Sequence, residues 1–409
     1  ASWRTDGSSR FAASKRWGNF WSVGASWRLS EEKFMQGIDW LNGLTLKFSY
    51  GVQGNNSVGS YYAYQALYDL SSPNATLPGA TINDVANADL TWESNNNLNT
   101  GLEARLFNRL DLSFEFYNRK TTDMLLAYPL PASSGFSSYY RNSGEMRNRG
   151  IEFALTGYIF DKEDLQWSVT WMGSTVNNKV LKLTDEGKDI IGGSQIIRVG
   201  ETLYSYYVAR SAGVDPMTGL KMYWAKDADG NDYITTSTSK AQDNRVIVGS
   251  RIPDLYGSLS TSFRWKNIDL AVSTNYSIGG KNYDGVYQEF MGCYYVAEAK
   301  HKDILRAWRK PGDITDVPRY EIGDVPIVTD DKLIDASYFS IKNITLGYTL
   351  PKLWTSKIGF KSARIAASVD NLWIFTHLKG MDPQYSLTGG TSYVYAPTRT
   401  VSFSLALKF

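Results

Sequence analysis

The sequence has few of the side chains that metal sites and redox chemistry require. Its 409 residues include one cysteine and two histidines. Cys293 has no partner within the chain for a disulfide, so we interpret it as incidental. His301 and His377 each fall in an expected loop, without cysteine or carboxylate neighbours at the spacing of a zinc site. We therefore expect no cofactor and no resident metal, and no set of residues predicts an enzyme.

Long apolar runs and an excess of charge are also lacking. No stretch reaches the roughly 18 successive apolar residues that predict a membrane-spanning helix. The chain has 43 basic and 41 acidic residues and a net charge of +2, so its overall charge does not favour nucleic acid. A transmembrane strand needs only about 9–11 tilted residues, and every second one faces away from lipid. A membrane β-barrel is therefore compatible with the lack of long apolar runs and with the nearly neutral net charge.

Glycine and aromatic side chains are plentiful, and they accompany a two-residue alternation. The chain has 35 glycines and 27 tyrosines, and 14% of its residues are aromatic. Segment 110–117 (LDLSFEFY) places Leu and Phe on one face and Asp, Ser, Glu and Tyr on the other, as in a half-buried strand. Segment 102–106 alternates likewise, and the short connection Asn108-Arg109 makes the two segments antiparallel neighbours. We interpret the charges on the polar faces as an ion-pair lattice along a barrel wall: Glu103, Arg105, Asp111 and Glu115.

Short turns and long segments follow one another along the chain. The other short turns are expected at Asp161–Asp164, Lys266-Asn267 and Pro351–Gly359. Short turns at one rim and long loops at the other are typical of an outer-membrane barrel, and the hairpins add up to about fourteen strands, the first truncated. Because Ala1–Asp6 already has the pattern of a strand, we expect an N-terminal portion before it. The long segments, expected as loops, are Asn55–Asn97, Ala127–Asn142, Asn177–Thr202, Ala225–Ile252, Gly280–Ala336 and Thr376–Pro397.

A large soluble β-sandwich or propeller is the alternative architecture, because its strands also alternate. Three observations favour the barrel. Trp, Tyr and Phe lie near the strand ends, where a membrane-interface girdle belongs. The asymmetry of the loops is systematic, and no blade-length repeat is present.

The last segment indicates the compartment. Val401–Phe409 (VSFSLALKF) alternates throughout and ends on an aromatic residue. Such a strand resembles the signal by which outer-membrane assembly machinery recognises its clients. We interpret the apolar face as that assembly signal: Phe403, Leu405, Leu407 and Phe409.

The expected loops hold the candidate contacts. Tyr and Trp give a large contact area and one polar group, which suits a sugar, a peptide or a partner protein, although membrane anchoring and loop packing explain them as well. Asp227, Asp229 and Asn231 form a weak calcium candidate, because the motif lacks the bidentate Glu of a calcium loop. Segment Asp284–Trp308 has helical spacing and predicts a helix over the barrel mouth. The aromatic candidates are Tyr61, Tyr62, Tyr139, Tyr140, Tyr223, Trp224, Tyr393 and Tyr395.

Seven blocks of the chain, in order, resemble SusC-like transporters of the SusC/RagA family. They are WRTDGSSRFAASKRWGNFWSVGASWRLSEEKFM, LTLKFSYGVQGN, LTWESNNNLNTGLE, RNSGEMRNRGIEF, SYFSIKNITLGYTLP, SVDNLWIFTHLKGMDPQY and TRTVSFSLALKF. Together they span nearly the whole sequence.

The resemblance implies more than the residues themselves do. Residues 1–409 correspond to the C-terminal part of an antiparallel barrel of about 22 strands, without the N-terminal plug and the TonB-binding segment. It implies a Gram-negative outer membrane, a SusD-like surface lipoprotein as partner, energy from the TonB-ExbB-ExbD system, and a dimer of SusC–SusD pairs.

Three functions remain open at this point. The first is active import of an oligosaccharide or oligopeptide. The second is a passive porin or a structural barrel within a larger outer-membrane assembly. The third is a soluble carbohydrate-binding β protein, and the sequence does not choose between a glycan and a peptide as substrate.

Overall fold

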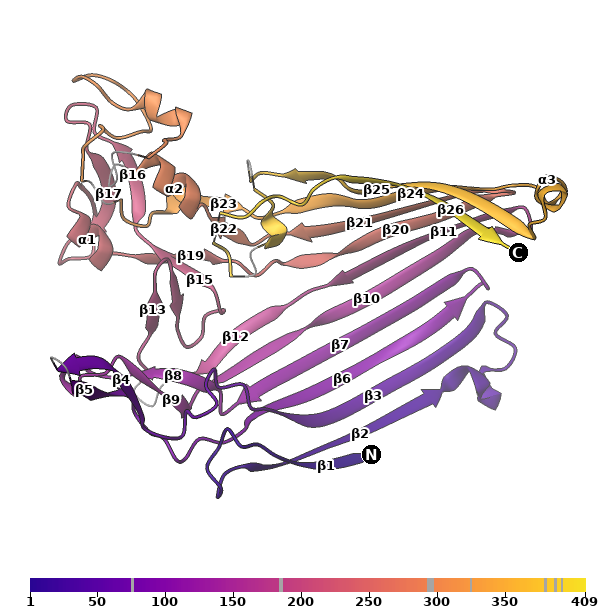
Figure 1. The fold of residues 1–409 in the computed structure, drawn as a ribbon, viewed down its shortest axis with the longest axis horizontal. Helices are drawn as coiled ribbons and strands as arrows, with labels where there is room; N and C mark the ends of the chain where they lie inside the picture. The colour runs from indigo at the N-terminus through magenta and orange to yellow at the C-terminus, as the bar shows by residue number, and fades with distance from the viewer. Residues whose placement is uncertain are drawn as a thin grey trace. The chain divides into compact units, whose positions relative to one another are not determined.

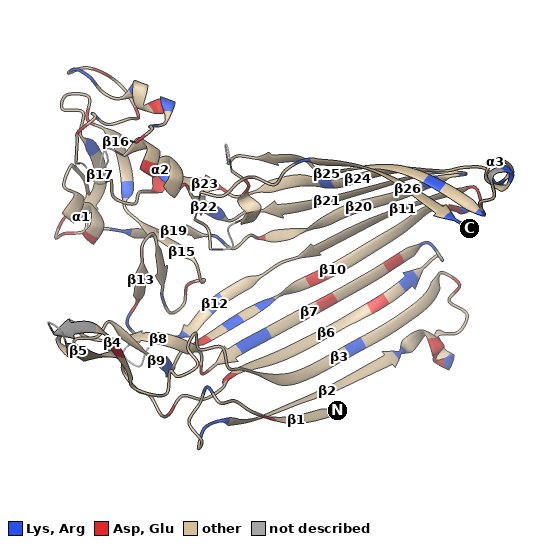
Figure 2. Cartoon of the chain, in the orientation of Figure 1, with Lys and Arg blue, Asp and Glu red and all other residues tan. Residues whose placement is uncertain are grey.

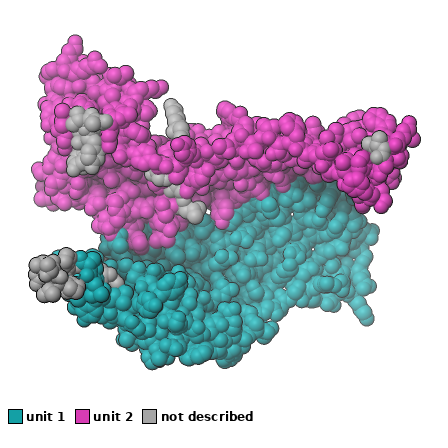
Figure 3. Space-filling model, viewed as in Figure 1, with its two compact units in different colours: residues 1–162, 166–190, 198–202 teal, residues 163–165, 191–197, 203–409 magenta. Residues whose placement is uncertain are grey.

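A computed structural model describes residues 1–74, 77–183, 187–292, 298–323, 326–378, 381–385, 388–390 and 393–409. The chain forms two compact units (Figure 3). Unit 1 comprises residues 1–162, 166–190 and 198–202, and unit 2 comprises residues 163–165, 191–197 and 203–409. Cys293 lies outside the described residues.

Unit 1 is built on a sheet of long antiparallel strands (Figure 1). Its strands, in the order in which neighbours pair, are β1 (Ser2–Gly7), β2 (Trp17–Arg28), β3 (Leu41–Asn55), β6 (Glu93–Leu106), β7 (Leu110–Thr122), β10 (Glu145–Lys162) and β11 (Leu165–Ser174). In addition, β12 (Asn177–Lys182) pairs with β10.

The register of this sheet confirms the two expected faces. Arg105 lies opposite Asp111 and Glu103 opposite Ser113, whereas Leu102 lies opposite Phe114 on the other face. An Arg105–Asp111 ion pair of 3.8 Å and a Lys47–Glu103 ion pair link neighbouring strands, and charged residues follow β3, β6, β7 and β10 (Figure 2). This lattice agrees with the interpretation of the polar face.

The apolar face of the same strands has no core beneath it. Leu46, Phe48 and Phe114 are 38%, 46% and 39% exposed, although they lie in the middle of well-formed ladders. A row of exposed aromatic and aliphatic side chains is the surface that a lipid-facing wall presents.

Unit 2 contains a second antiparallel ladder of long strands. Their order is β20 (Leu255–Trp265), β21 (Ile268–Ile278), β24 (Tyr338–Thr349), β25 (Ser362–Thr376) and β26 (Thr400–Lys408). Asp269 and Arg364 pair at 2.5 Å on the polar face, where Gly347 leaves room between them. With the long strands of unit 1 and β12, thirteen strands are described, close to the expected fourteen.

The short turns lie together at one end of each unit, as expected. In unit 1, Phe107 N donates to Trp40 O at 2.7 Å and Tyr158 N to Arg109 O at 2.8 Å. In unit 2, Lys266 N donates to Asp164 O at 2.7 Å, and segment 350–361 contains the helix α3 (Lys352–Thr355). Adjacent hairpins are therefore tied to one another at their turns.

The long loops carry small sheets of their own. Unit 1 has the hairpins β4 (Leu67–Asn74)–β5 (Leu77–Asp84) and β8 (Leu125–Pro129)–β9 (Ser138–Asn142). Buried apolar residues gather in these loops, for example Phe11, Val58 and Leu90 in unit 1. The remaining loop strands, mainly of unit 2, are β13 (Ile190–Gly192), β14 (Gln195–Ile197), β15 (Ser205–Val208), β19 (Val246–Ser250), β16 (Arg210–Val214), β17 (Lys221–Lys226), β18 (Asp232–Thr235), β22 (Lys281–Tyr283) and β23 (Leu333–Asp335).

Three expectations about the loops are corrected. Residues 93–97 are not loop, because they extend β6 along β3 as far as Glu93 opposite Asn55. The expected loops 177–202 and 225–252 are not two separate loops: residues 177–182 form β12 and pair with β10, and the strands between the two loops pair in small sheets and not in the long ladders. The helix expected over 284–308 is shorter and broken into α2 (Gly285–Met291) and a 3-10 turn (Lys302–Arg306), with 293–297 outside the described residues.

No helix among the described residues has both the length and the apolar character to cross a membrane.

Candidate functional site

A cavity with charged and apolar walls lies in the loop region of unit 2. It has a volume of about 90 Å³, several times the 10–15 Å³ or so that one water requires. We call it the loop cavity. Its lining comes from β17, the region of α2 and three stretches of the loop that precedes β24: Lys221, Tyr223, Tyr287, Gln288, Met291, Gly292, Ile304, Asp316, Val317, Pro318, Arg319, Tyr320, Pro326, Ile327, Thr329, Asp331 and Lys332.

Backbone hydrogen bonds hold one wall of the cavity in place. Ala209 N donates to Val328 O at 3.1 Å, and Asp330 N donates back to Ala209 O at 3.0 Å. Asp284 N donates to Lys332 O at 3.0 Å, which ties the start of α2 to the same stretch. Asp331 and Lys332 are thereby fixed beside β17, although more than a hundred residues separate them from it in sequence.

The opposite wall is tied to the turn between β16 and β17. Arg319 N donates to Gly219 O at 2.8 Å. Trp308 Nε1 donates to Pro216 O at 2.9 Å, and Gly312 N donates to the same oxygen at 2.8 Å. Gly219 has a φ of +72°, and a Cβ there would meet the Trp308 ring at 2.4 Å, so this contact requires glycine.

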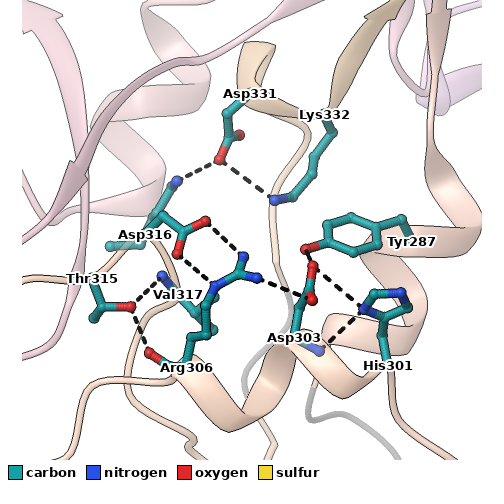
Figure 4. A network of polar contacts seen from close by, with 10 residues as sticks. Tyr287, His301, Asp303, Arg306, Thr315, Asp316, Val317, Asp331 and Lys332 are labelled. Carbon is teal, nitrogen blue, oxygen red and sulfur yellow. Dashed lines mark hydrogen bonds and ion pairs between the residues drawn. The ribbon is translucent and has the colours of Figure 1, made fainter. Parts of the chain in front are cut away.

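Asp331 is the centre of the charged wall. Its carboxylate lies 3.5 Å from Lys332 Nζ (Figure 4). It also lies 2.6 Å from Lys221 Nζ and accepts a hydrogen bond from Thr329 Oγ1. Burial acts to raise the pKa of Asp331, but the charges of Lys221 and Lys332 outweigh it and the net pKa is lowered. Asp331 is therefore ionised at neutral pH, and two ammonium groups share one carboxylate.

A second polar network lies beside α2. Tyr287 Oη donates to Asp303 Oδ2 at 2.9 Å, and Arg306 joins Asp303 at 3.0 Å to Asp316 at 2.9 Å (Figure 4). Burial raises the pKa of Tyr287 to about 12, and the hydrogen bond to the Asp303 carboxylate adds to the shift. His301 Nδ1 accepts from Asp303 N at 3.2 Å, so this histidine caps the 3-10 turn at Lys302–Arg306.

Gln288, one of the lining residues, has a buried acceptor without a described partner. Its Nε2 donates to Pro326 O at 3.0 Å, but its buried Oε1 receives no hydrogen bond from any described residue. Leaving a buried acceptor unpaired costs about 1–3 kcal/mol, so such an atom stands out in a folded protein.

The expected aromatic contacts are divided between the two units. Tyr61, Tyr62, Tyr139 and Tyr140 belong to unit 1, and the others belong to unit 2. Tyr61 and Tyr395 are 67% and 97% exposed, whereas Tyr140 packs on the core around Phe11. Of the eight, Tyr223 alone lines the loop cavity, and it is 5% exposed because its ring also packs on Ala209 and Ala241.

The weak calcium candidate forms a turn. Asp227 Oδ1 accepts from Asp229 N at 3.0 Å and from Asn231 N at 2.8 Å, which closes the connection between β17 and β18. In the described part of the chain, no group of three or more His, Cys, Asp or Glu is arranged to hold a metal. We therefore assign these side chains to the turn.

Three of the assembly-signal residues lie on one face of β26, as the alternation predicts, and Phe409 follows the end of the strand. Phe403 pairs across the ladder with Ala367, Leu405 with Ile365 and Leu407 with Ala363. The Phe409 ring lies 5.0 Å from the Phe360 ring at the turn end of β25, so the last aromatic packs at that rim.

Most polar residues of the cavity were not predicted from the sequence, among them Lys221, Gln288, Asp331 and Lys332. No local motif joins them, because three separate segments supply them. Two signals in the sequence pointed to this region: the helical spacing around residue 288 and the aromatic candidate Tyr223.

Comparison with known proteins gives a consistent result. The family described as "TonB dependent receptor-like, beta-barrel" matches residues 1–372. The TonB-dependent receptor P3 of Formosa agariphila is 31% identical over 99% of this chain and 43% of its own length. The TonB-dependent receptor SusC of Bacteroides thetaiotaomicron is 27% identical over 99% of this chain and 41% of its own length. The chain thus spans less than half the length of these curated relatives.

Solved structures agree with the sequence relatives. The RagAB peptide transporter superposes with a TM-score of 0.88 at 30% identity, covering 98% of this chain and 44% of that one. The RagAB peptide importer in its closed-closed state gives a TM-score of 0.89 at 30% identity, covering 100% and 45%.

Proposed function

The chain belongs to the TonB-dependent receptor β-barrel family and is SusC-like, and from that premise we propose that it is part of an active outer-membrane importer of oligopeptides or oligosaccharides. The observation that carries the proposal is the likeness to the RagAB transporter over 98% of the chain. Outer-membrane location agrees with strands that are apolar on one face and carry ion pairs on the other.

We further propose the partners. SusC-like transporters are expected to work with a SusD-like surface lipoprotein, so the long loops of this chain are its docking region. Energy would reach the barrel from the TonB-ExbB-ExbD system through the plug and TonB-binding segment, which we place in the N-terminal part of the full transporter. A dimer of such transporter–lipoprotein pairs is part of the same proposal.

An oligopeptide is the favoured substrate. The similar solved structures are those of a peptide transporter and a peptide importer, and the names of the sequence relatives state no substrate. A glycan remains the second candidate.

Uptake measurements test this function. Cells with the full-length transporter should take up labelled oligopeptides faster than cells without it, and an uncoupler of the proton-motive force should abolish the difference. Labelled oligosaccharides in parallel decide the substrate class. Uptake that is insensitive to the uncoupler would support the passive porin, and equal uptake with and without the transporter, for both ligand classes, would refute the function.

A further inference from the structure

Four cations gather at the loop end of the long sheet of unit 1. Lys120 of β7 lies opposite Arg147 of β10, and Arg147 in turn lies opposite Lys179 of β12. Arg149 is two residues from Arg147 on the same strand, so its side chain lies on the same face. Figure 2 shows Lys and Arg concentrated at this end of β7 and β10. We call these four residues the basic cluster.

The basic cluster lies on the apolar face of the sheet and not on the face that carries the ion-pair lattice. Along β7, Lys120 is in phase with Phe114 and Phe116, and along β10, Arg147 is in phase with Ile151. No register shift interrupts the ladder between these two strands, so the alternation holds along it. Lys120 is four residues beyond Phe116, a rise of about 13 Å along the strand. The cluster therefore lies just beyond the lipid-facing wall, at the level of lipid headgroups.

Little negative charge balances the basic cluster. Glu145 pairs with Lys120 at 2.7 Å, and among the described residues the four cations have no other ion pair. Like charges directly opposite one another destabilise a sheet, so a row of three cations is costly unless an anion lies nearby. Arg149 and Lys179 are exposed, so an anion outside the sheet can reach them.

The same face of unit 2 differs at its loop end. There, Tyr276, Phe339 and Phe375 form one cross-strand row. Phe339 and Phe375 are 37% and 56% exposed, as expected for aromatic side chains at a membrane interface. The four cations of unit 1 are therefore a local feature and not a repeated property of the rim.

The position and the charge of the cluster suit a phosphate group on a membrane lipid. Cations beside an apolar wall match a ligand that has both negative charge and acyl chains, and arginine binds phosphate through parallel N–H donors. We propose that the basic cluster binds the phosphate groups of lipid A, the phosphorylated glycolipid of the outer leaflet, while the acyl chains lie along the apolar wall. This inference goes beyond import. It rests on the outer-membrane location and on long loops that face outward.

Lipid binding to the full transporter tests the inference. The detergent-purified protein, cleared of bound lipid, would be titrated with lipid A and with the same lipid after removal of its phosphates, and native mass spectrometry would measure the bound fraction. Charge-assisted contacts predict that the phosphorylated form binds about ten-fold tighter or more. Millimolar inorganic phosphate should not displace it, because the acyl chains also contribute to binding.

Variants assign the preference to the basic cluster. Arg147→Gln and Lys179→Gln should each weaken the binding of phosphorylated lipid A about five-fold, the usual effect of one cation near an anionic membrane surface. Both should leave the binding of the dephosphorylated lipid unchanged, and Arg147→Lys should lose less than Arg147→Gln. Arg119→Gln is the matched control with the same charge change, because Arg119 precedes Lys120 on β7 and lies over the Tyr117 ring on the opposite face.

Thermal unfolding provides a second readout that separates lipid binding from a folding defect. In detergent without lipid A, Arg147→Gln should melt no lower than the unmodified transporter, because the substitution removes one of three like charges from the row. Phosphorylated lipid A should then raise the melting temperature of the unmodified transporter more than that of the variant.

Equal affinity for lipid A with and without its phosphates would overturn the inference. The same conclusion would follow if inorganic phosphate displaced the lipid, or if Arg119→Gln weakened binding as much as Arg147→Gln. Normal lipid binding by Arg147→Gln and Lys179→Gln, together with loss of a second copy of the transporter or of a partner lipoprotein, would instead assign the cluster to a protein interface and also overturn it.

Discussion

Leu405 and Ser404 are neighbours on β26 whose side chains lie on opposite faces. Leu405 is in one cross-strand row with Ile365, Tyr348 and Ile268. Ser404 is in the neighbouring row with Ala366, Gly347 and Asp269. The first row is apolar and the second carries the Asp269–Arg364 ion pair. Substitutions at these two positions therefore test the lipid-facing side and the polar side of the sheet at nearly the same depth in the membrane.

Leu405→Arg should destabilise the folded barrel by roughly 2–4 kcal/mol if this position lies near the bilayer midplane, because arginine is costly in lipid. Ser404→Arg should have a much smaller effect, because its side chain faces the polar side. Unfolding of the full transporter by urea in lipid vesicles measures both. Similar losses for the two variants would contradict the assignment of the faces.

At the scale of the strand, Gly101 allows β6 and β7 to pair closely. A Cβ at this position would meet Phe114 O at 2.5 Å and Glu115 Cα at 3.1 Å, and both are backbone atoms that cannot turn away. Gly157, on β10, has nothing within 4 Å of the same position.

Gly101→Ala should therefore destabilise the β6–β7 hairpin by about 1–3 kcal/mol, the usual cost of overpacking. Gly157→Ala is the matched control and should be neutral or slightly stabilising. The fraction of protein that keeps the mobility of a folded barrel in unheated gels, followed with temperature, reports the difference. Equal melting of the two variants would show that the close approach does not constrain the strand.

The strands were predictable and the loop sheets were not, for a physical reason. In β6 and β7 the alternation of faces is a local property, and the short turn at Asn108 makes the partner the next segment of the chain. The small sheets of β15–β19 and β16–β18 have short strands with no clear alternation, and their position depends on contacts with residues 328–332. The loop cavity also depends on contacts between segments that are distant in sequence. Tyr223 could therefore be predicted as a candidate contact from its residue type alone, whereas Asp331 could not be predicted.

At the scale of the whole molecule, the arrangement of turns and loops predicts which residues face the cell exterior. Asn267 lies in the turn between β20 and β21, and Gly192 lies in the β13–β14 hairpin at the other end of unit 2 (Figure 1). If the long loops face outward, these two sites lie on opposite sides of the membrane.

Single-cysteine labelling checks this orientation. With the native Cys293 replaced by serine, a membrane-impermeant maleimide on intact cells should label Gly192→Cys and should leave Asn267→Cys unlabelled. Asn267→Cys should react only after the outer membrane is permeabilised. Labelling of Asn267→Cys on intact cells would reverse the proposed orientation.

The hydrogen bonds between Ala209 and residues 328 and 330 also set an order for assembly. They join points more than a hundred residues apart, and closing so long a loop in an unfolded chain carries a large entropy cost. Pairing of β20 with β21, which lie between these points in the sequence, shortens the effective loop before the bonds form. We therefore expect the long strands to pair first and the loop cavity to form afterwards. Newly inserted transporters should pass through a period in which they are embedded and folded as strands but not yet competent to bind.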